Sequence, residues 1–485
     1  MLLSKIFKGT DVKINNDIDI KYITFDSRKI QKDYMFVAIN GFELDGHKYI
    51  ESAINKGATA ILIDESRYDE FKDLNVEVLT TKSTRFIMGK LACNFYDNPS
   101  KEIKLIGITG TKGKTTTTFM VKKILEESGK KVGLVGTVAC YIGEKKLRDS
   151  DRTTPEALEL QGLFRQMINE GCEYVVMEVS SQSLKLGRVD GCHFDIALFT
   201  NLSEDHISPH EHSSMKEYFE CKCKLFDMTK NGIVNIDDKK GRELIKLKPN
   251  CNFKTYSIRN DSDKKATNVK ITSDLTTYKT NINNKEELVE ISIPGRFSVY
   301  NSLGAISICE ELGIDTKYIL SGLKNVQVPG RSEIIENDKG FTIMIDYAHS
   351  EDSLLNILKA VKSYTKGRVI CVFGLGGDRD TRKRPKMGKI AGKLADFTII
   401  SSDNPRYDDP MEIAEEIAKG TKEVTDQYTI ITDRAKAVEY ALKMAQKDDL
   451  VLLAGKGHET YQLVGDEKVH FSEKEVIKRV LEEIS

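Results

Sequence analysis

The sequence predicts an α/β protein of three domains, with a mostly parallel sheet in each of the two larger ones. Its 485 residues correspond to about three domains at roughly 150 residues each. Apolar strand patterns alternate with helical patterns along two long stretches, which is typical of a parallel sheet with helices on both faces. A polar break at 95–102 (FYDNPSKE) separates these stretches from a smaller N-terminal unit.

That N-terminal unit, residues 1–98, is expected to be a small α/β domain. Residues 35–39 (MFVAI) are predicted as a short strand, and residues 58–64 (ATAILID) as a second one. Between them a helix is expected over residues 47–57, because the pattern is helical and stops at a glycine.

The central domain is expected to span residues 99–328. Its strands are predicted at 104–110, 131–137, 173–181 and 194–203, with a helix at 116–129. Residues 252–293 are rich in Thr, Asn and Lys and are predicted as a peripheral β-meander. The sequence PGRSE at 329–333 marks the second domain boundary.

The C-terminal domain, residues 329–485, is expected to be Rossmann-like. Strands are predicted at 341–349, 368–377, 397–405, 428–433 and 449–457, with helices at 411–420 and 434–446. Ligands of such sheets bind at the carboxyl ends of the strands. Unusual polar clusters stand at those ends, at 346–349, 374–380, 403–406 and 455–459.

Composition excludes several classes of protein. Lys and Arg number 73 and Asp and Glu 74, a formal net charge of −1, so the basic excess of a nucleic-acid binder is absent. No apolar run approaches 18 residues, and the N-terminus has no signal-peptide core, which predicts a cytoplasmic protein without a membrane span. Nine cysteines without a CxxC pair predict free thiols.

The strongest local signal is GITGTKGKTTTT at residues 107–118. A predicted strand enters a glycine-rich turn, which is followed by Lys114 and by Thr115 at the start of a helix. Backbone N–H groups in such a turn bind phosphate together with the helix N-terminus. Lys114 would reach the β- and γ-phosphates, and the Thr115 hydroxyl would bind Mg²⁺. Ile108 replaces the first glycine of the usual GxxxxGK[ST] pattern.

The segment GTKGKTT resembles the GTNGKT[ST] loop of the Mur ligases, which form amide bonds with ATP in peptidoglycan precursor synthesis. Lys112 stands where that loop usually has asparagine. The resemblance covers nearly the whole chain, because further segments follow in the family's order: DSRKIQKDYMFVAINGFELDGHKYI, RTTPE, MEVSSQSLKLGRVDG, TNLSEDH, YFECKCKLF, GRFSVYN, PGRSE, DYAH, GLGGDRDTRKRPKMG, DNPR and GKGHETYQ.

The resemblance is to the MurE branch of this family and implies its reaction. ATP would phosphorylate the D-glutamyl γ-carboxylate of UDP-N-acetylmuramoyl-L-alanyl-D-glutamate. The amine of meso-diaminopimelate would then attack the acyl phosphate, giving an amide, ADP and phosphate. The implied architecture is an N-terminal uridine-binding domain, a central P-loop ATPase domain and a C-terminal domain that presents the amino acid. ATP, the sugar nucleotide and the amino acid are the expected partners, with two Mg²⁺ ions, no nucleic acid and a monomeric enzyme.

Three alternatives remain open at this point. The first is a MurE ligase that adds L-lysine instead of diaminopimelate. The second is another ligase of the superfamily, such as a folylpolyglutamate synthetase. The third is a non-catalytic nucleotide-binding regulator built on the same P-loop.

The resemblance also implies which residues bind ATP and metal. Glu178 and His206, each after a predicted buried strand, match metal-binding positions, together with Thr115. Lys222 matches the lysine that becomes carbamylated to N6-carboxylysine, and the carbamate can bind cations. Lys222 is preferred to Lys224 because it stands four residues after Tyr218, as in the family. The implied ATP-binding set is Gly110, Thr111, Lys112, Gly113, Lys114, Thr115, Thr116, Asn301, Arg331 and Asp346.

Two further sets are implied for the other substrates. The sugar-nucleotide set is Phe25, Ser27, Phe42, Glu43, Leu44, Thr153, Thr154, Ser180 and Arg188, and Leu186 replaces a glutamine contact of some relatives. The amino-acid set is Arg379, Asp403, Asn404, Pro405, Arg406, Gly455 and Glu459. No role is assigned to His210 or His212, and Glu351 stands where the commoner DYAHxP motif has proline.

Arg406 is the residue expected to select the amino acid. In the family pattern, Arg at the fourth position of DNPR marks the diaminopimelate enzymes, because a guanidinium can bind the distal carboxylate through two parallel hydrogen bonds. Arg379 would bind a second carboxylate, and Gly455 and Glu459 would bind the distal ammonium. The structural alternative is that Arg406 only pairs with Asp408 or Asp409 in an exposed loop.

Overall fold

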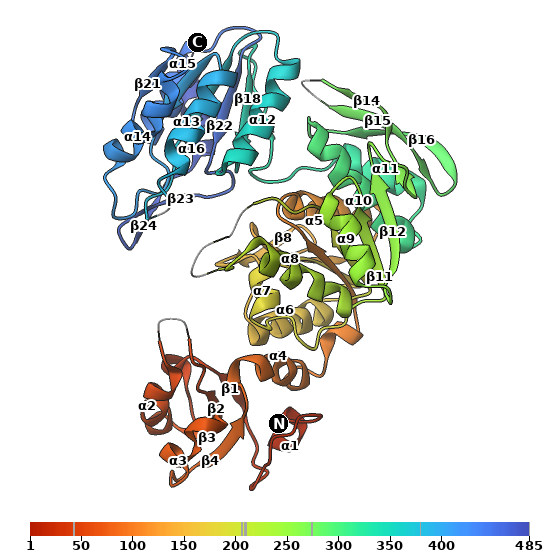
Figure 1. Cartoon of the computed structure of the whole chain (residues 1–485), viewed down its shortest axis with the longest axis vertical. Helices are drawn as coiled ribbons and strands as arrows, with labels where there is room; N and C mark the ends of the chain where they lie inside the picture. The colour runs from red at the N-terminus through yellow and green to blue at the C-terminus, as the bar shows by residue number, and fades with distance from the viewer. Residues whose placement is uncertain (42–43, 205–206, 208–210, 273–274, 379, 485) are drawn as a thin grey trace. The chain divides into compact units, whose positions relative to one another are not determined.

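A computed structural model describes residues 1–41, 44–204, 207, 211–272, 275–378 and 380–484 (Figure 1). The chain forms two compact units. The first consists of Met1–Lys265, Ile282–Asn284 and Tyr300–Gly322, and the second of Ala266–Asn281, Lys285–Val299 and Leu323–Ser485. Each unit contains a mostly parallel sheet, which confirms the expected α/β class. The boundaries of the three expected domains remain predictions.

The N-terminal sheet consists of four parallel strands in the order β1-β2-β3-β4. They are β1 (Tyr22–Thr24), β2 (Tyr34–Val37), β3 (Ala58–Asp64) and β4 (Glu77–Thr81). Helices α1 (Leu3–Ile6) and α4 (Thr84–Phe95) pack on one face and α2 (Ile50–Asn55) on the other. The helix expected over 47–57 begins as the 3₁₀ turn η2 (Gly46–Tyr49) and ends before Gly57, whose φ is 104°.

The central sheet has nine strands in the order β13-β12-β11-β10-β5-β9-β6-β7-β8. They are β5 (Lys104–Thr109), β6 (Val132–Val135), β7 (Ala139–Ile142), β8 (Lys145–Asp149), β9 (Tyr174–Glu178), β10 (Ile196–Phe199), β11 (Asn231–Asn235), β12 (Asn252–Ser257) and β13 (Lys264–Lys265). All neighbours pair in parallel except β6 with β7 and β7 with β8. Strand β5 is therefore central, and its carboxyl end carries the predicted phosphate loop.

Helices cover both faces of this sheet because alternate residues of its apolar strands point to opposite sides. Helix α5 (Lys114–Glu127) contacts β5, β6 and β9. The core on the other face draws on α6 (Ala157–Asn169), α8 (Met215–Cys223) and α9 (Lys239–Leu247).

Residues 252–293 differ in part from the predicted meander. Strand β12 pairs in parallel with β11 and so extends the main sheet. Helix α9 forms the crossover that a parallel pair requires. The prediction that this strand belongs to a peripheral meander was therefore wrong. The separate three-stranded sheet contains β14 (Thr267–Ile271), β15 (Thr276–Ile282) and β16 (Lys285–Ile291). Helices α10 (Arg296–Glu311) and α11 (Thr316–Lys324) follow.

The C-terminal sheet has the order β17-β18-β22-β19-β20-β21, and only the edge strand β17 is antiparallel. Its strands are β17 (Glu333–Ile335), β18 (Thr342–Asp346), β19 (Val369–Phe373), β20 (Phe397–Ile400), β21 (Tyr428–Ile430) and β22 (Leu450–Ala454), and the hairpin β23 (Tyr461–Val464) and β24 (Glu467–His470) follows β22.

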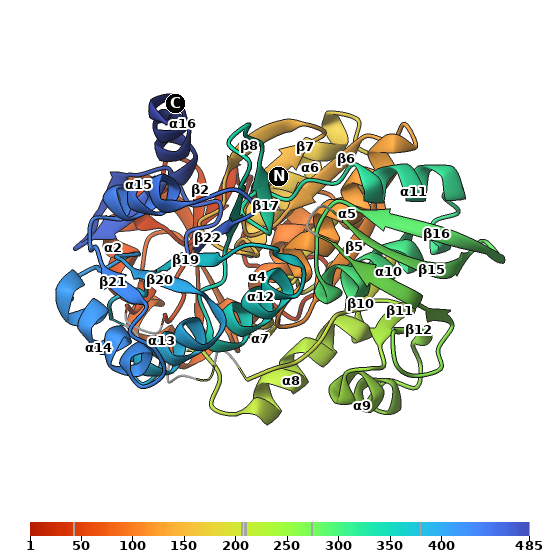
Figure 2. The same cartoon turned by 90° about the horizontal axis from the view of Figure 1, so that it is seen from above.

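Five helices enclose this C-terminal sheet (Figure 2). On one face lie α12 (Glu351–Tyr364), α13 (Lys383–Leu394) and α14 (Pro410–Lys422), and on the other α15 (Arg434–Met444) and α16 (Glu473–Glu483). All nine cysteines are buried and free, as expected. In the part of the chain that the structure describes, no helix is long and apolar enough to cross a membrane.

Candidate active site

The turn between β5 and α5 is shaped by two glycines and held by the segment after β10. Gly110 (φ 144°) and Gly113 (φ 89°) have positive φ, and a Cβ on either would collide with a neighbouring side chain. The Thr200 hydroxyl donates to the carbonyl of Lys112 at 2.7 Å, and the Asn201 side-chain oxygen accepts from the Lys112 N–H at 3.0 Å. The loop is thereby fixed at the N-terminus of α5, where unpaired N–H groups favour anions.

The residues predicted to bind ATP from the segment 110–116 lie around this loop, and Asn301 joins them. The Lys114 ammonium lies back across it, donating to the carbonyls of Gly110 at 2.9 Å and Thr111 at 3.1 Å. Thr115 and Thr116 are buried in the first turn of α5. Asn301, predicted from a segment nearly 200 residues away, lies against Gly113. The Lys114 ammonium therefore lies at the loop, where phosphate oxygens of a bound nucleotide would replace the Gly110 and Thr111 carbonyls as its acceptors.

Glu178 forms the carboxylate end of this site. It ends β9, which is paired with β5 at Ile108, and its side chain is almost fully buried. Its carboxylate accepts from the Thr115 hydroxyl at 3.0 and 3.1 Å, from the Thr137 N–H at 2.8 Å and from the Thr137 hydroxyl at 3.1 Å. Among the described residues, no ammonium or guanidinium forms an ion pair with it. A buried carboxylate beside a hydroxyl, balanced only by neutral donors, fits Mg²⁺, which prefers hard oxygen ligands.

The two candidate lysines of the segment YFECKCK lie in different environments. Lys222, on α8, is almost fully buried, and its Nζ donates to the Gly110 carbonyl at 2.9 Å. The same ammonium lies 4.5 Å from the ring centre of Tyr218, whose hydroxyl is 3.1 Å from that of Thr111. Lys224 is exposed and points instead to the Leu184 carbonyl at 3.4 Å. Only Lys222 of the pair therefore borders the phosphate loop.

The loop between β10 and α8 contains three histidines, and the structure describes only one of them. His206 and His210 lie outside the described residues. His212 is buried, with Nε2 2.9 Å from the Ser181 hydroxyl and its ring 5.0 Å from that of Tyr218. Burial lowers the pKa of His212 to about 4, so the ring is neutral near pH 7. Sequence reasoning assigned it no role, and its spacing offered no signal of this contact.

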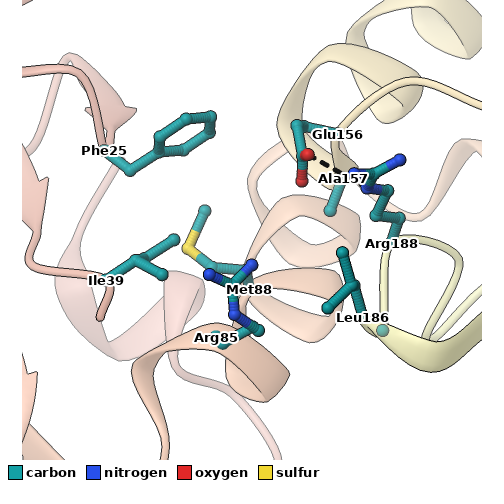
Figure 3. Close-up of a pocket in the computed structure, with 9 residues that line it drawn as sticks. Phe25, Ile39, Arg85, Met88, Glu156, Ala157, Leu186 and Arg188 are labelled. Carbon is teal, nitrogen blue, oxygen red and sulfur yellow. Dashed lines mark ion pairs between the residues drawn. The ribbon is translucent and has the colours of Figure 1, made fainter. Parts of the chain in front are cut away.

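A pocket in the first unit is lined by residues that follow β1 and β2, by helix α4, by the start of α6 and by the segment after α7 (Ser181–Lys185) (Figure 3). Two predicted sugar-nucleotide residues, Phe25 and Arg188, line it together with Leu186. Arg85 and Met88 of α4 also line it and were not predicted, because nothing in the segment TRFIMGK marks a ligand contact. The complete lining is Phe25, Ile39, Arg85, Met88, Glu156, Ala157, Leu186, Gly187 and Arg188.

The predicted dipeptide residues form one cluster with Glu178. The Thr154 hydroxyl donates to the Glu178 carbonyl at 2.9 Å and accepts from the Ser180 N–H at 3.0 Å. Thr153 is 3.1 Å from the Thr137 hydroxyl, which itself bonds Glu178. Arg188 donates to the Thr154 carbonyl at 3.3 Å, and its Nε is 2.9 Å from Glu156.

The remaining N-terminal positions are only partly defined. Ser27 begins the 3₁₀ turn η1 (Ser27–Lys29), and its carbonyl accepts from Lys56 at 3.0 Å. Leu44 is 66% exposed. Phe42 and Glu43 lie outside the described residues.

In the second unit, Arg331 and Asp346 are neighbours. The Asp346 carboxylate accepts from the Ser332 N–H at 2.7 Å, and the Arg331 guanidinium lies 4.5 Å from the ring centre of Tyr347. Burial raises the pKa of Asp346, and Arg331 and the Ser332 N–H oppose the rise. Both predicted nucleotide residues are therefore held at the carboxyl end of β18.

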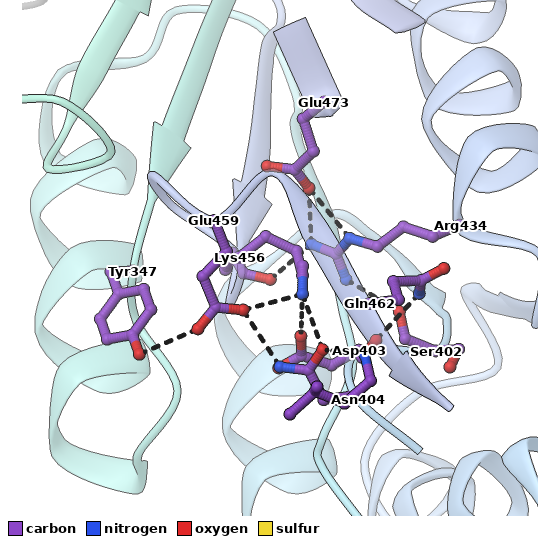
Figure 4. A network of polar contacts seen from close by, with 11 residues as sticks. Tyr347, Ser402, Asp403, Asn404, Arg434, Lys456, Glu459, Gln462 and Glu473 are labelled. Carbon is purple, nitrogen blue, oxygen red and sulfur yellow. Dashed lines mark hydrogen bonds and ion pairs between the residues drawn. The ribbon is translucent and has the colours of Figure 1, made fainter. Parts of the chain in front are cut away.

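Three predicted amino-acid residues meet in a polar network of the second unit (Figure 4). The Glu459 carboxylate accepts from Asn404 at 3.0 Å, and the Asp403 carboxylate lies 3.4 Å from Lys456 Nζ. Gly455 has φ 114°, and its N–H donates to the Asp346 carbonyl at 3.0 Å. Sequence reasoning missed Lys456, although it stands inside GKGHE, because lysines usually face water and this one is fully buried.

Arg406 is not paired in the way that the structural alternative required. Asp408 pairs with Arg384 at 2.6 Å, and Asp409 caps α14 through the N–H groups of Met411 and Glu412. Within the described residues, the Arg406 guanidinium has no hydrogen-bond or ion-pair partner. Its φ is 54°, and its N–H donates to the Leu463 carbonyl at 3.0 Å, which fixes its backbone beside β23. Pro405 precedes it in a buried position, and Arg379 lies outside the described residues.

Three family models match the chain in sequence order. They are described as "Mur ligase family, catalytic domain" over residues 19–96, "Mur ligase middle domain" over 108–309, and "Mur ligase, glutamate ligase domain" over 330–457.

Named relatives match over the full length. A protein of Caldanaerobacter subterraneus subsp. tengcongensis named UDP-N-acetylmuramoyl-L-alanyl-D-glutamate--2,6-diaminopimelate ligase is 47% identical over 100% of this chain and 99% of its own. A Clostridium tetani protein of the same name is 44% identical over 100% of both chains. A solved structure with that name has a TM-score of 0.71 at 26% identity and covers 100% of this chain and 99% of its own. The MurF ligase of Thermotoga maritima, solved with ADP, shares the fold with a TM-score of 0.64 at 18% identity, over 96% of this chain and 98% of its own.

Proposed function

This chain belongs to the Mur ligase family, and from that premise we propose that it joins meso-diaminopimelate to the D-glutamyl γ-carboxylate of UDP-N-acetylmuramoyl-L-alanyl-D-glutamate with ATP. The observation that carries the choice of amino acid is Arg406. Its guanidinium has no partner among the described residues, in a loop whose Asn404 donates to Glu459 at 3.0 Å. Full-length relatives at 47% and 44% identity carry the name of this reaction. ATP and the nucleotide-linked substrate place the reaction in the cytoplasm.

The first chemical step is phosphoryl transfer from ATP to the γ-carboxylate. The backbone N–H groups at the start of α5 bind the phosphates, and Lys114 exchanges its two loop carbonyls for phosphate oxygens. The carboxylate oxygen forms a bond to the γ-phosphorus while the bond to the β–γ bridging oxygen breaks, which gives an acyl phosphate and ADP. Fixed positive charge stabilises the negative charge of this transition state.

Glu178 and Thr115 are the described residues that would hold Mg²⁺, and the carbamate formed on Lys222 would extend this acidic site. Bound Mg²⁺ supplies positive charge to the phosphates. Carbamylation replaces the Lys222 ammonium, which now donates to Gly110, with an anion. His206 completes the proposed metal set. Asn301, Arg331 and Asp346 are assigned to the nucleotide.

The second step is attack of the amino-acid amine on the acyl phosphate. The new C–N bond forms as the C–O bond to phosphate breaks, and the amine loses a proton. Arg188, Thr153, Thr154 and Ser180 hold the dipeptide close to Glu178, and Phe25 with Ser27 holds the uridine end. The anionic dipeptide suits the guanidinium of Arg188.

Arg406 would bind the carboxylate on the distal carbon of diaminopimelate, which lysine lacks. With lysine bound, this guanidinium would stay without a partner. Loss of one partner of such a pair costs roughly 2–5 kcal/mol, which is about 30- to several-thousand-fold in kcat/KM.

The test is phosphate release with ATP and the UDP-muramoyl dipeptide while the amino acid is varied. Meso-diaminopimelate should be used at least about 30-fold better than L-lysine, and Arg406→Ala should remove most of that preference. A preference for lysine would identify the lysine-adding alternative. Activity with glutamate on a folate acceptor would identify a folylpolyglutamate synthetase, and nucleotide binding without phosphate release would identify a regulator.

A further inference from the structure

Lys456 is a fully enclosed charged side chain of the region predicted to bind the amino acid. It follows β22 in the turn GKGHE, and its side chain has no exposed surface. Its Nζ donates to Glu459 Oε2 at 2.8 Å and to Asn404 Oδ1 at 2.9 Å, and lies 3.4 Å from Asp403 Oδ1 (Figure 4). A single ammonium therefore connects the DNPR loop with the residue proposed to bind the distal ammonium of the substrate.

Asn404 completes this connection. Its side-chain oxygen accepts from Lys456 and from the Leu463 N–H at 2.9 Å, and its amide donates to Glu459 Oε2 at 3.0 Å. Leu463 also accepts from the Arg406 N–H at 3.0 Å. The backbone of Arg406 and the carboxylate of Glu459 are thus fixed to one another through two shared neighbours.

The charges of the network leave room for one more cation. Three carboxylates (Asp403, Glu459 and Glu473) face two cations (Lys456 and Arg434), and Arg434 pairs with Glu473 at 2.7 Å. Lys456 alone is shared between Asp403 and Glu459. Within the described part of the chain, the Glu459 Oε1 atom accepts only from a neutral donor, the Tyr347 hydroxyl at 3.2 Å. An ammonium from the substrate would balance the remaining negative charge.

We propose that Lys456 is a positioning residue that sets the stereochemical preference of the enzyme at the distal carbon of diaminopimelate. This inference rests on the proposed function. The distal carbon carries a carboxylate, an ammonium, a hydrogen and the chain that leads to the reacting amine. With the Arg406 backbone fixed relative to the Glu459 carboxylate, and with the chain of the substrate held at the reacting end, the two side chains would accept the carboxylate and the ammonium in one arrangement only. Inversion at that carbon exchanges two substituents, so one of the two ionic contacts is lost.

The experiment measures kcat and KM for meso- and LL-diaminopimelate in wild type, Lys456→Met and Lys474→Met. Lys474 is a matched control, since it is half-exposed in the same unit and pairs with Glu333. In Lys456→Met, the ratio of kcat/KM for the meso over the LL isomer should fall at least tenfold. The loss should lie in KM for the meso isomer, with kcat within about threefold. Lys474→Met should keep the wild-type ratio.

A folded Lys456→Met enzyme that keeps the wild-type ratio would overturn the inference, as would a loss confined to kcat. If Lys456→Met does not fold, Lys456→Gln retains donors for Glu459 and Asn404. Its ratio should then fall at least threefold, and an unchanged ratio would overturn the inference. Wild type that uses neither isomer would overturn the proposed function itself, whereas wild type that uses both equally would overturn only the role of Lys456.

Discussion

Glu178 and Glu459 both lie near the carboxyl ends of parallel strands, but their charges are balanced differently. Among the residues that the structure describes, Glu178 accepts only from hydroxyls and a backbone N–H, so its charge remains available to a bound cation. Glu459 accepts from the Lys456 ammonium, from Asn404 and from Tyr347. Burial raises the pKa of Glu459, but the Lys456 ammonium and the hydrogen bonds from Asn404 and Tyr347 together outweigh this effect, and the net pKa is below its usual value.

The difference indicates separate roles for charge in the two regions. At the phosphate loop, Lys114 and Lys222 donate to backbone carbonyls and Glu178 accepts from neutral donors. Substitutions there should remove chemistry while the fold persists. In the C-terminal region, buried cations and carboxylates form ion pairs with one another. Substitutions there should change the stability of the protein or its selectivity for the amino acid.

The largest effect is expected for Lys114→Ala. Removal of the ammonium from the phosphate loop should lower phosphate release by about 10³-fold or more, because transition-state charge loses a fixed donor. Binding of the UDP-muramoyl dipeptide, measured by calorimetry, should stay near wild type. Lys123→Ala on the same helix, where Lys123 pairs with Glu127 at 2.9 Å, is the control and should remain active. Wild-type turnover by Lys114→Ala would disprove the assignment of the loop.

A slightly smaller loss, about 10²- to 10³-fold in kcat, is expected for Lys222→Ala. The substitution removes the site of carbamylation beside Gly110. Formate should restore part of the activity by replacing the carbamate, and the measurement is turnover as formate is titrated. Lys224→Ala is the paired variant and should be nearly unaffected, since Lys224 is exposed. The reverse pattern would show that Lys224 is the modified residue.

In the C-terminal region the comparison predicts a loss of stability instead. Arg434 and Glu473 are both almost fully buried and joined at 2.7 Å (Figure 4). Arg434→Met leaves the Glu473 carboxylate without its cation and should cost about 3 kcal/mol of unfolding free energy. The double variant Arg434→Met/Glu473→Leu should recover much of this loss. Thermal unfolding followed by circular dichroism measures both, and a double variant no more stable than the single one would contradict this account.

The central region is also the one that sequence predicts better. The phosphate loop is one contiguous segment. The spacing of its glycines, Lys114 and Thr115 predicts phosphate and Mg²⁺ binding from physical chemistry alone. Glu178 and Lys222 required the family pattern, since a buried strand end or a helical lysine has no chemical meaning by itself. The partner of β12 was mispredicted because alternation along one strand does not specify which edge it joins.

The C-terminal network was less predictable because its members come from separate turns. Tyr347, Asn404, Lys456 and Gln462 meet through tertiary folding, and no spacing in the sequence links them. Arg434 begins a helix, where an exposed arginine is the ordinary expectation, but it is fully buried. The family resemblance supplied Asp403, Asn404 and Glu459 as amino-acid residues. Without that resemblance, only the polar character of the strand ends indicated that this region binds a ligand.

The smallest effect is expected from His212, a buried titratable group of the central region. Its pKa is about 4 in the folded protein, against about 6.5 in an unfolded chain, because burial disfavours the imidazolium. Below pH 6.5 the unfolded state binds a proton that the folded state does not, so this contribution lowers stability as pH falls towards 4. Between pH 7.5 and pH 5, wild type should lose about 1–2 kcal/mol more than His212→Phe. Loss of the bond to Ser181 adds a constant offset to the variant. Thermal unfolding of both proteins over this range measures the difference, and parallel pH profiles would show that His212 is not held neutral by the fold.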